Sequence, residues 1–349
     1  EVRLTVIRQG TKKNKVERKI ISIVREEIKL NDKDADSKLI NHKLGNKTLK
    51  IGYIKLPSFY SDRRTGKTST NDIKQQINKM KRGGAQGIIL DLRGNPGGSL
   101  REAINIGGLF IKKGPILQVK SSFGEPRSYD DNDGSIEYYK GALIVLIDKF
   151  SASASEIVAG AMKDYKRGII IGPSNSFGKG TVQQYQPLRG KKGAIKITMQ
   201  IFYQPAGTSN QLTGIIPHVK VPDSSLFWDI GEAKTRYPVK WKKIASAKFK
   251  KYNYVSSRIL RLLKTKSQKR INNNKKFKKL LAEIKKFKKQ MKNKSISLKE
   301  EVKIKDRKKE NLEKKRNKRN SNTLVDKDDL FLFEAFNIMH DYVKLFPKR

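Results

Sequence analysis

The chain has 349 residues, a formal charge of +45 and no cysteine. The length suggests about two domains, and the absence of cysteine excludes thiol nucleophiles, disulfides and thiolate metal sites. The charge favours acidic partners such as nucleic acid or anionic lipid, although most of the excess is lysine, which solvent-exposed surfaces tolerate. The three histidines, at positions 42, 218 and 340, share no metal-ligand spacing, so we expect them to be structural or solvated and expect no metal site.

The first segment, residues 1–31, alternates apolar and polar side chains on both sides of a polar turn at 10–14. This pattern predicts a β-hairpin, which a polar stretch at 31–34 closes. The segment is too short to bury a core of its own. We therefore expect it to be the end of a domain that starts before Glu1.

Strand-like and helix-like segments alternate between residues 48 and 222. Apolar periodicity predicts helices at 70–81, 100–111 and 156–165. Strands are predicted at 51–59, 87–93, 142–148 and 168–172, and two more, at 181–184 and 194–203, are expected to extend the same sheet. Alternation of this kind predicts an α/β layered fold.

The last part of the chain, residues 225–349, is predicted to be all-α. Helices are expected at 256–264, 277–291, 298–318 and 330–346, the last with Asp326 or Asp328 as its N-cap. Ten lysines fall within 275–294, away from the apolar stripe of that helix. We expect a solvated face, with a nucleic-acid or lipid surface as the alternative, because lysine without interleaved aromatics is weak evidence for base stacking.

Three loops, at 91–98, 151–156 and 176–181, each follow a predicted strand, where α/β proteins place their sites. In the second loop Ser153 lies between a strand and a helix, so its hydroxyl would sit beside helix N-terminal amides that can stabilise an oxyanion. The alternative for Ser153 is structural, because Ser153-x-x-Glu156 is also a capping box.

The third loop carries Lys179 between glycines, but Gly180 follows it, so the Walker phosphate-loop pattern fails. Desolvation can lower a lysine pKa by several units, and a neutral Lys179 could then take the proton of a serine hydroxyl. No histidine lies near these loops in sequence. The alternatives are a surface lysine and a remote His218 brought in by the fold.

These loops carry three motifs that resemble, in the same order, those of the tail-specific proteases, also called carboxy-terminal processing peptidases. They are Leu-Asp-Leu-Arg-Gly-Asn-Pro-Gly-Gly at 90–98, Asp-Lys-Phe-Ser-Ala-Ser-Ala-Ser-Glu-Ile at 148–157 and Ser-Phe-Gly-Lys-Gly-Thr-Val-Gln-Gln at 176–184. Flanking residues at 108–111 and 139–141 resemble the long, periplasmic branch. The resemblance implies a crotonase-like α/β protease core at 33–224, the last strands of a PDZ domain at 1–32 and an all-α C-terminal domain at 225–349.

The resemblance also assigns roles to individual residues. It implies Ser153 as nucleophile, Lys179 as general base, Gln183 as the residue that orients the lysine, and Asp164 as a further residue linked to activity. The oxyanion amides would come from Ala154 and the turn Gly97-Gly98. The stretch 172–179 is one residue longer than is usual in the family.

The implied function is a serine endopeptidase that acts on protein or peptide substrates from their apolar C-terminal tails, without a metal or cofactor. The resemblance further implies a periplasmic location, on the periplasmic side of the inner membrane, and an adaptor lipoprotein as a partner, with no nucleic acid. Two alternatives stay open. One is a basic, non-catalytic module for nucleic acid or anionic lipid, and the other is an α/β protein whose paired backbone amides handle acyl-CoA.

Overall fold

The computed structural model describes residues 1–349 except 10–15, 27–33, 132–136, 293–323, 327 and 348–349. The chain divides into two units, Glu1–Lys33 and Asp34–Arg349. In the first unit, β1 (Val2–Gln9) and β2 (Val16–Ile23) form an antiparallel hairpin. The predicted hairpin is therefore confirmed, while its turn at 10–14 lies outside the described residues. That this hairpin belongs to a PDZ domain stays a prediction.

The second unit contains a six-stranded sheet with the order β12-β9-β8-β5-β4-β3. Its strands β4, β5, β8, β9 and β12 are parallel, and β3 is an antiparallel edge strand that the sequence analysis missed. The strands β5, β8 and β9 are buried along their whole length, as expected for Ile- and Leu-rich strands inside a parallel sheet. The strand bounds are β3 Asp36–Leu44, β4 Lys47–Lys55, β5 Gly87–Asp91, β8 Ala142–Leu146, β9 Ile169–Gly172 and β12 Val219–Lys220.

A second, antiparallel sheet has the order β10-β11-β6-β7. The prediction that residues 181–184 and 194–203 extend the main sheet is therefore wrong. These residues form β10 and β11, and β11 pairs with β6, whose Gln118 lies opposite Tyr203. Strand alternation does not reveal which strands pair, since pairing depends on contacts between distant segments. The bounds are β6 Gly114–Ser121, β7 Arg127–Asp131, β10 Thr181–Pro187 and β11 Ala194–Tyr203.

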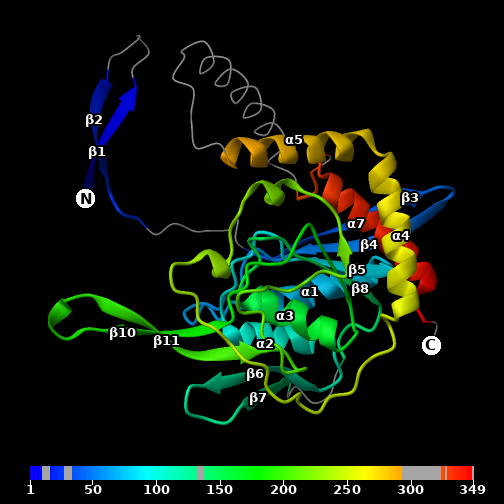
Figure 1. Ribbon diagram of the computed structural model, residues 1–349, viewed down its shortest axis with the longest axis horizontal. Helices are drawn as coiled ribbons and strands as arrows, with labels where there is room; N and C mark the ends of the chain where they lie inside the picture. Colours follow the sequence, from blue (N-terminus) through cyan, green and yellow to red (C-terminus); the bar gives the residue numbers. More distant parts are fainter. Residues whose placement is uncertain (10–15, 27–33, 132–136, 293–323, 327, 348–349) are drawn as a thin grey trace. The chain divides into compact units, whose positions relative to one another are not determined.

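The three predicted core helices are confirmed as α1 (Ser69–Arg82), α2 (Leu100–Gly108) and α3 (Ala154–Asp164). They share one hydrophobic core with one face of the main sheet and the inner side of the second sheet. Figure 1 shows α2 and α3 between the two sheets. The serine loop connects the end of the buried strand β8 to the start of α3, and the packing of both elements in this core holds the two ends of the loop in place.

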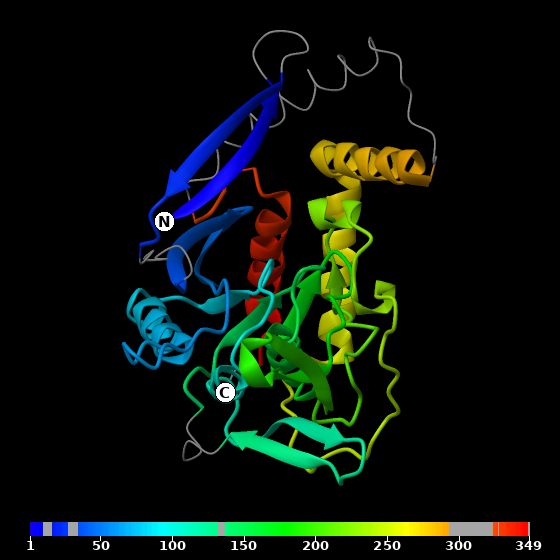
Figure 2. The ribbon, with the colours of Figure 1, turned by 90° about the vertical axis from the view of Figure 1, so that its left-hand side faces the viewer.

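The other face of the main sheet is covered by C-terminal helices. These are α4 (Ser257–Asn273) and α7 (Leu330–Leu345), which lie side by side in Figure 2. Phe336 of α7 and Leu263 of α4 are fully buried in a core shared with Tyr53 of β4. Residues 34–349 thus pack as one unit, in which the C-terminal helices complete the sheet.

The N-cap of α7 is Asp329, whose carboxylate accepts the Leu332 N–H at 2.9 Å. The prediction of Asp326 or Asp328 is therefore wrong. Aspartates close together in sequence are equally suited to cap a helix, and here the one selected also contacts Arg93 across the fold.

The lysine-rich helix is α5 (Lys275–Lys292). Its Phe287 packs edge-on against Phe227, with ring centroids 5.3 Å apart, and its Ile284 is buried. The described lysine side chains of α5 are exposed, as expected for a solvated face. The helix predicted at 298–318 lies outside the described residues, and none of the described helices combines the length and apolar character needed to cross a membrane.

Candidate active site

The three loops singled out in the sequence meet at one edge of the main sheet. Asp91 at the end of β5 is in register with Leu146 of β8, which is in register with Ile171 of β9. Because parallel strands end at the same edge, the loops that follow them lie next to one another. The loops 92–98, 147–153 and 173–180 therefore form a common site.

A cavity of about 250 Å³ lies among these loops. Five of the seven predicted site residues line it, namely Gly98, Ser153, Ala154, Lys179 and Gln183. Its other walls are mostly apolar and come from Leu100, Ile157, Val182 and Phe202, together with Thr181 and Lys196. Gly97 and Asp164 are not among the lining residues.

Ser153 precedes α3 in a strained backbone conformation, with φ 56° and ψ −111°. An ordinary N-cap residue has extended backbone angles, as Thr68 does before α1, with φ −134° and ψ 146°. A positive φ is uncommon for a residue other than glycine, and such strain clusters at functional sites. The conformation of Ser153 therefore favours a functional role over simple helix capping.

Glu156 joins the serine loop to the lysine loop. Its buried carboxylate accepts the Ser153 N–H at 2.9 Å and the Lys179 N–H at 2.9 Å. It also accepts the Gly178 N–H at 2.8 Å and the Ser176 hydroxyl. Burial raises the pKa of Glu156 to about 7, although these four donors act to lower it. The sequence showed only its place in the capping box, because its contacts to residues 176–179 arise from the fold.

Lys179 lines the cavity together with Ser153 and is half-buried. Its pKa is lowered, mainly by desolvation and then by the like charge of Lys196, while Glu232 and Glu156 oppose the shift. Within the stretch 172–179, Phe177 N–H donates to the Ser151 carbonyl at 3.0 Å, and the extra residue relative to the family stays a prediction. The structure thus brings a serine and a desolvated lysine to the same cavity.

The glycine turn contributes two different features. Gly97 N–H donates to Asn95 Oδ1 at 2.9 Å, so this amide is already engaged. Gly98 lies opposite Phe59 in an isolated parallel β-bridge. The bonds of this bridge are made by the neighbours of Gly98: Phe59 N–H donates to Gly97 O, and Ser99 N–H donates to Phe59 O. In such a bridge the N–H of the central residue points away from the partner strand. Gly98, whose N–H points away from Phe59, therefore differs from Gly97, and it lines the cavity together with Ala154.

The remaining predicted site residues have other contacts. Gln183 lines the cavity, and its amide donates to Thr198 Oγ1 at 3.4 Å. Asp164 is the last residue of α3, about 15 Å along the helix axis from the Ser153 end. Its half-buried carboxylate accepts the Ala206 N–H at 2.8 Å, which holds the turn after β11. The structure therefore places Asp164 outside the cavity, where it acts on a loop.

Of the three histidines expected to be structural or solvated, His218 is confirmed as structural. His218 Nδ1 accepts the Ile170 N–H at 3.0 Å, and burial lowers the pKa of this histidine to about 4. It is not among the residues that line the cavity. Across the described part of the chain, no three His, Asp or Glu side chains form a cluster that could hold a metal ion.

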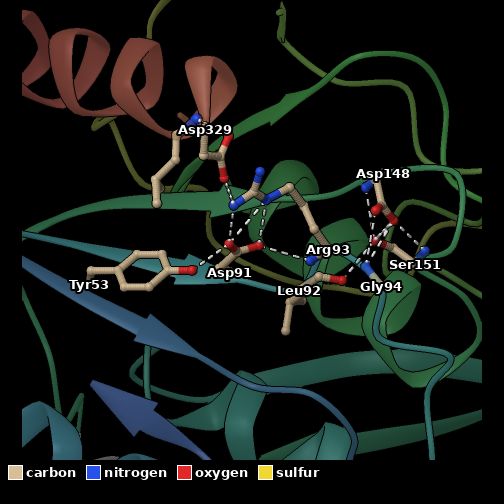
Figure 3. Close-up of polar contacts among 9 residues, drawn as sticks. Tyr53, Asp91, Leu92, Arg93, Gly94, Asp148, Ser151 and Asp329 are labelled. Carbon is tan, nitrogen blue, oxygen red and sulfur yellow. Dashed lines mark hydrogen bonds and ion pairs between the residues drawn. The ribbon is translucent and has the colours of Figure 1, made fainter. Parts of the chain in front are cut away.

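A second polar network, which the sequence did not predict, holds the glycine loop (Figure 3). The buried carboxylate of Asp91 accepts the Tyr53 hydroxyl at 2.8 Å and the Arg93 guanidinium at 2.6 Å. Burial would raise the pKa of Asp91, but the charge and hydrogen bonds of Arg93 outweigh it and lower the pKa. Asp148 accepts both the Gly94 N–H at 3.0 Å and the Ser151 hydroxyl at 3.1 Å, and so connects the glycine loop to the serine loop.

Comparison with known proteins gives matches over most of this unit. Residues 50–221 match peptidase family S41, and residues 227–344 match the C-terminal domain of tail specific protease. The Haemophilus influenzae protein named tail-specific protease is 39% identical over 251 residues, which cover 69% of this chain and 34% of that protein. The Bartonella bacilliformis carboxy-terminal-processing protease is 38% identical over 228 residues, which cover 60% of this chain and 50% of that protein.

The chain thus spans between a third and a half of the length of these relatives. Among solved structures, a photosystem II D1 C-terminal processing protease is 27% identical, with a TM-score of 0.48, over 58% of this chain and 52% of that one. The two matching family regions follow each other directly and take in all three sequence motifs. On the two family matches and the two sequence relatives, the chain belongs to peptidase family S41, in the group that carries the C-terminal domain of tail-specific proteases.

Proposed function

We propose that the chain is the catalytic part of a serine endopeptidase in which Ser153 is the nucleophile and Lys179 the general base. The observation that carries this proposal is the shared cavity, in which both side chains lie beside the Gly98 and Ala154 backbone. Membership of a peptidase family supports it. A metal or nucleotide has no part in the proposed reaction.

The reaction would proceed through an acyl-enzyme. The neutral amine of Lys179 takes the proton from Ser153 Oγ as this oxygen attacks the scissile carbonyl carbon. The negative charge on the carbonyl oxygen is stabilised by the Ala154 and Gly98 N–H groups. Lys179 then gives its proton to the leaving amine, the C–N bond breaks, and a water molecule deprotonated by Lys179 hydrolyses the ester.

The lowered pKa of Lys179 is what makes this proton transfer feasible. A lysine at its ordinary pKa of about 10.4 is almost wholly protonated at neutral pH and cannot act as a base. Each unit of depression removes about 1.4 kcal/mol from the cost of forming the neutral amine. Gln183 is proposed to orient Lys179 once substrate fills the cavity, and Asp164 to act indirectly through the turn at Ala206.

The substrates are proposed to be proteins or peptides with apolar C-terminal tails. Leu100, Ile157, Val182 and Phe202 give the cavity apolar walls next to Ser153, which suits an apolar side chain beside the scissile bond. The names of the relatives refer to tails and carboxy-terminal processing. A periplasmic location, on the periplasmic side of the inner membrane, and an adaptor lipoprotein complete the proposal through the family resemblance.

The test is a peptidase assay on the intact protein with Ser153→Ala and Lys179→Ala. We expect each variant to lower kcat by about 10⁴-fold or more, because nucleophile and base act as one unit. Matched controls are Ser174→Ala and Lys163→Ala, whose side chains bond to Asn175 O and Ile216 O away from the cavity. If either Ser153→Ala or Lys179→Ala retains a tenth or more of the wild-type kcat, the proposal is contradicted.

A further inference from the structure

The N-cap residue of α7 has a second contact, which reaches the active-site loops. Asp329 caps the helix through the Leu332 N–H, and its carboxylate also lies 2.9 Å from the Arg93 guanidinium. Figure 3 shows Arg93 between Asp329 on one side and Asp91 on the other. The guanidinium also lies over the Phe331 ring, 4.8 Å from its centroid. Arg93 is therefore held between the end of β5 and the start of α7.

This arginine begins the loop that ends in the oxyanion turn. Its backbone N–H donates to Asp91 Oδ1 at 2.9 Å, which fixes the direction in which the chain leaves β5. Four residues later, Gly97 packs directly on the serine loop, since a Cβ added there would lie 2.9 Å from Ser153 Cβ. A shift of Arg93 would thus be passed along a short, tightly packed loop to the Gly98 amide.

The charges make this contact more than a surface ion pair. The Arg93 side chain is 16% exposed, and those of Asp91 and Asp329 are 2% and 24% exposed. When an ion pair is shielded from water to this extent, loss of one partner leaves the other charge poorly compensated. No step of the proposed reaction uses Asp329, so its two contacts call for an explanation of their own.

We propose that Asp329 is a positioning residue that couples the docked C-terminal helix α7 to the oxyanion amides through Arg93. The inference rests on the proposed peptidase function. In this account α7 completes the active site, since its N-cap residue holds the loop that presents Gly98 to the substrate carbonyl.

The test compares Asp329→Asn with Asp341→Asn in the intact protein. Asparagine caps helices as well as aspartate does, so the first variant keeps the start of α7 and removes only the charge that faces Arg93. Asp341 lies at the other end of the same helix, where it pairs with Lys266 at 3.0 Å and Arg270 at 2.8 Å. Both variants therefore weaken an ion pair of α7, but only the first touches the loop.

We expect Asp329→Asn to lower kcat about tenfold, with KM within twofold, because the oxyanion donor is displaced while the substrate pocket is kept. A peptide boronic acid, whose tetrahedral adduct uses the same amides, should bind about tenfold more weakly. The Asp341→Asn variant should stay within twofold of the wild type in all three quantities. Equal loss of kcat in both variants, or no loss in Asp329→Asn, overturns the inference.

A second measurement does not depend on activity. Hydrogen–deuterium exchange of a peptide covering residues 92–99 should be faster in Asp329→Asn than in the wild type and unchanged in Asp341→Asn. Unchanged exchange in Asp329→Asn overturns the inference even if the protein is a peptidase. If the wild type lacks peptidase activity, the proposed function fails, and the exchange result still decides whether Asp329 positions the loop.

Discussion

At the scale of single residues, the site depends on backbone conformations that most side chains avoid. Among the described residues, Ser153 is one of three other than glycine with positive φ, together with Lys166 and Leu212. Gly97 and Gly98, with φ of 104° and 148°, approach the serine loop and Phe59 so closely that a Cβ at either position would clash. The strained backbone of Ser153 is thus packed against a turn whose conformation and close contacts require glycine.

The turn gives a direct prediction. We expect Gly97→Ala to lower kcat by about 100-fold, because the added Cβ would press on the Ala152 carbonyl and Ser153 Cβ and displace the oxyanion donors. Gly94→Ala is the matched control, since Gly94 also has positive φ but no atom within 4 Å of an added Cβ. Steady-state kinetics of both variants measure the difference. Similar kcat values for the two variants would show that the contact with Ser153 is unimportant.

Glu156 predicts a pH dependence of stability. Its pKa rises from 4.5 to about 7 on folding, so between these values the folded state binds a proton that the unfolded state has released. Titration of Glu156 therefore contributes stability at low pH that is lost as the pH rises toward 7, by about 3 kcal/mol in total.

The measurement is urea unfolding of the wild type and Glu156→Gln at intervals from pH 4.5 to pH 7.5. We expect the free energy of unfolding of the wild type to fall more steeply with pH than that of the variant, since glutamine does not titrate. Parallel pH profiles would contradict the raised pKa of Glu156.

At the scale of elements, the strand ends position the site loops, and the C-terminal helices α4 and α7 cover the other face of the sheet. The strands β5, β8 and β9 bring the loops to one edge, and α3 presents Ser153. Helix α7 covers the opposite face of the sheet, and its N-cap residue Asp329 meets Arg93. Phe336 of α7 is fully buried, and its ring lies edge-on to Tyr53 of β4 at 6.3 Å. Helix α7 is therefore part of the core that supports the sheet.

We expect Phe336→Ala to lower the free energy of unfolding by about 3–5 kcal/mol, because it leaves a cavity between α7 and the sheet. Phe333 on the same helix is 37% exposed and serves as the matched control, with an expected loss of less than half that amount. Denaturant unfolding followed by tryptophan fluorescence and circular dichroism measures both. Equal losses would show that α7 does not pack on the sheet as described.

The elements also show how far the sequence could predict the fold. Helices α1, α2 and α3 follow from their apolar periodicity, and the central strands β5, β8 and β9 from their short apolar runs. Strands β3, β6, β7 and β12 were missed, and β10 and β11 were assigned to the wrong sheet. These errors share one physical cause, because strand pairing is decided by distant partners and not by the local pattern.

The site shows the same division. Three motifs, each contained in a single loop and matched to the family, predicted Ser153, Lys179, Ala154 and Gly98. All four residues line the cavity. The residues that hold the loops together, Glu156, Asp148 and the pair Arg93–Asp329, were not predicted in these roles. Their contacts cross from one loop to another or from a loop to α7, so only the folded chain brings them into reach.

At the scale of the whole molecule, three loops distant in sequence converge on a single cavity within the unit Asp34–Arg349, and the N-cap residue of α7 contacts Arg93 in the first of these loops. The net charge of +45 says little about this convergence, since charge affects association and solubility but not fold. The central claim for the molecule is that the convergence makes Ser153 a nucleophile activated by Lys179.

Labelling of the intact protein with a fluorophosphonate, which phosphonylates activated serines with loss of fluoride, tests that claim most directly. Mass spectrometry should find one label, at Ser153. The labelling rate should rise with pH as Lys179 becomes neutral, at a pKa below its ordinary 10.5, and should fall by orders of magnitude in Lys179→Ala. A label on another serine, or labelling of Lys179→Ala at the wild-type rate, would contradict the account.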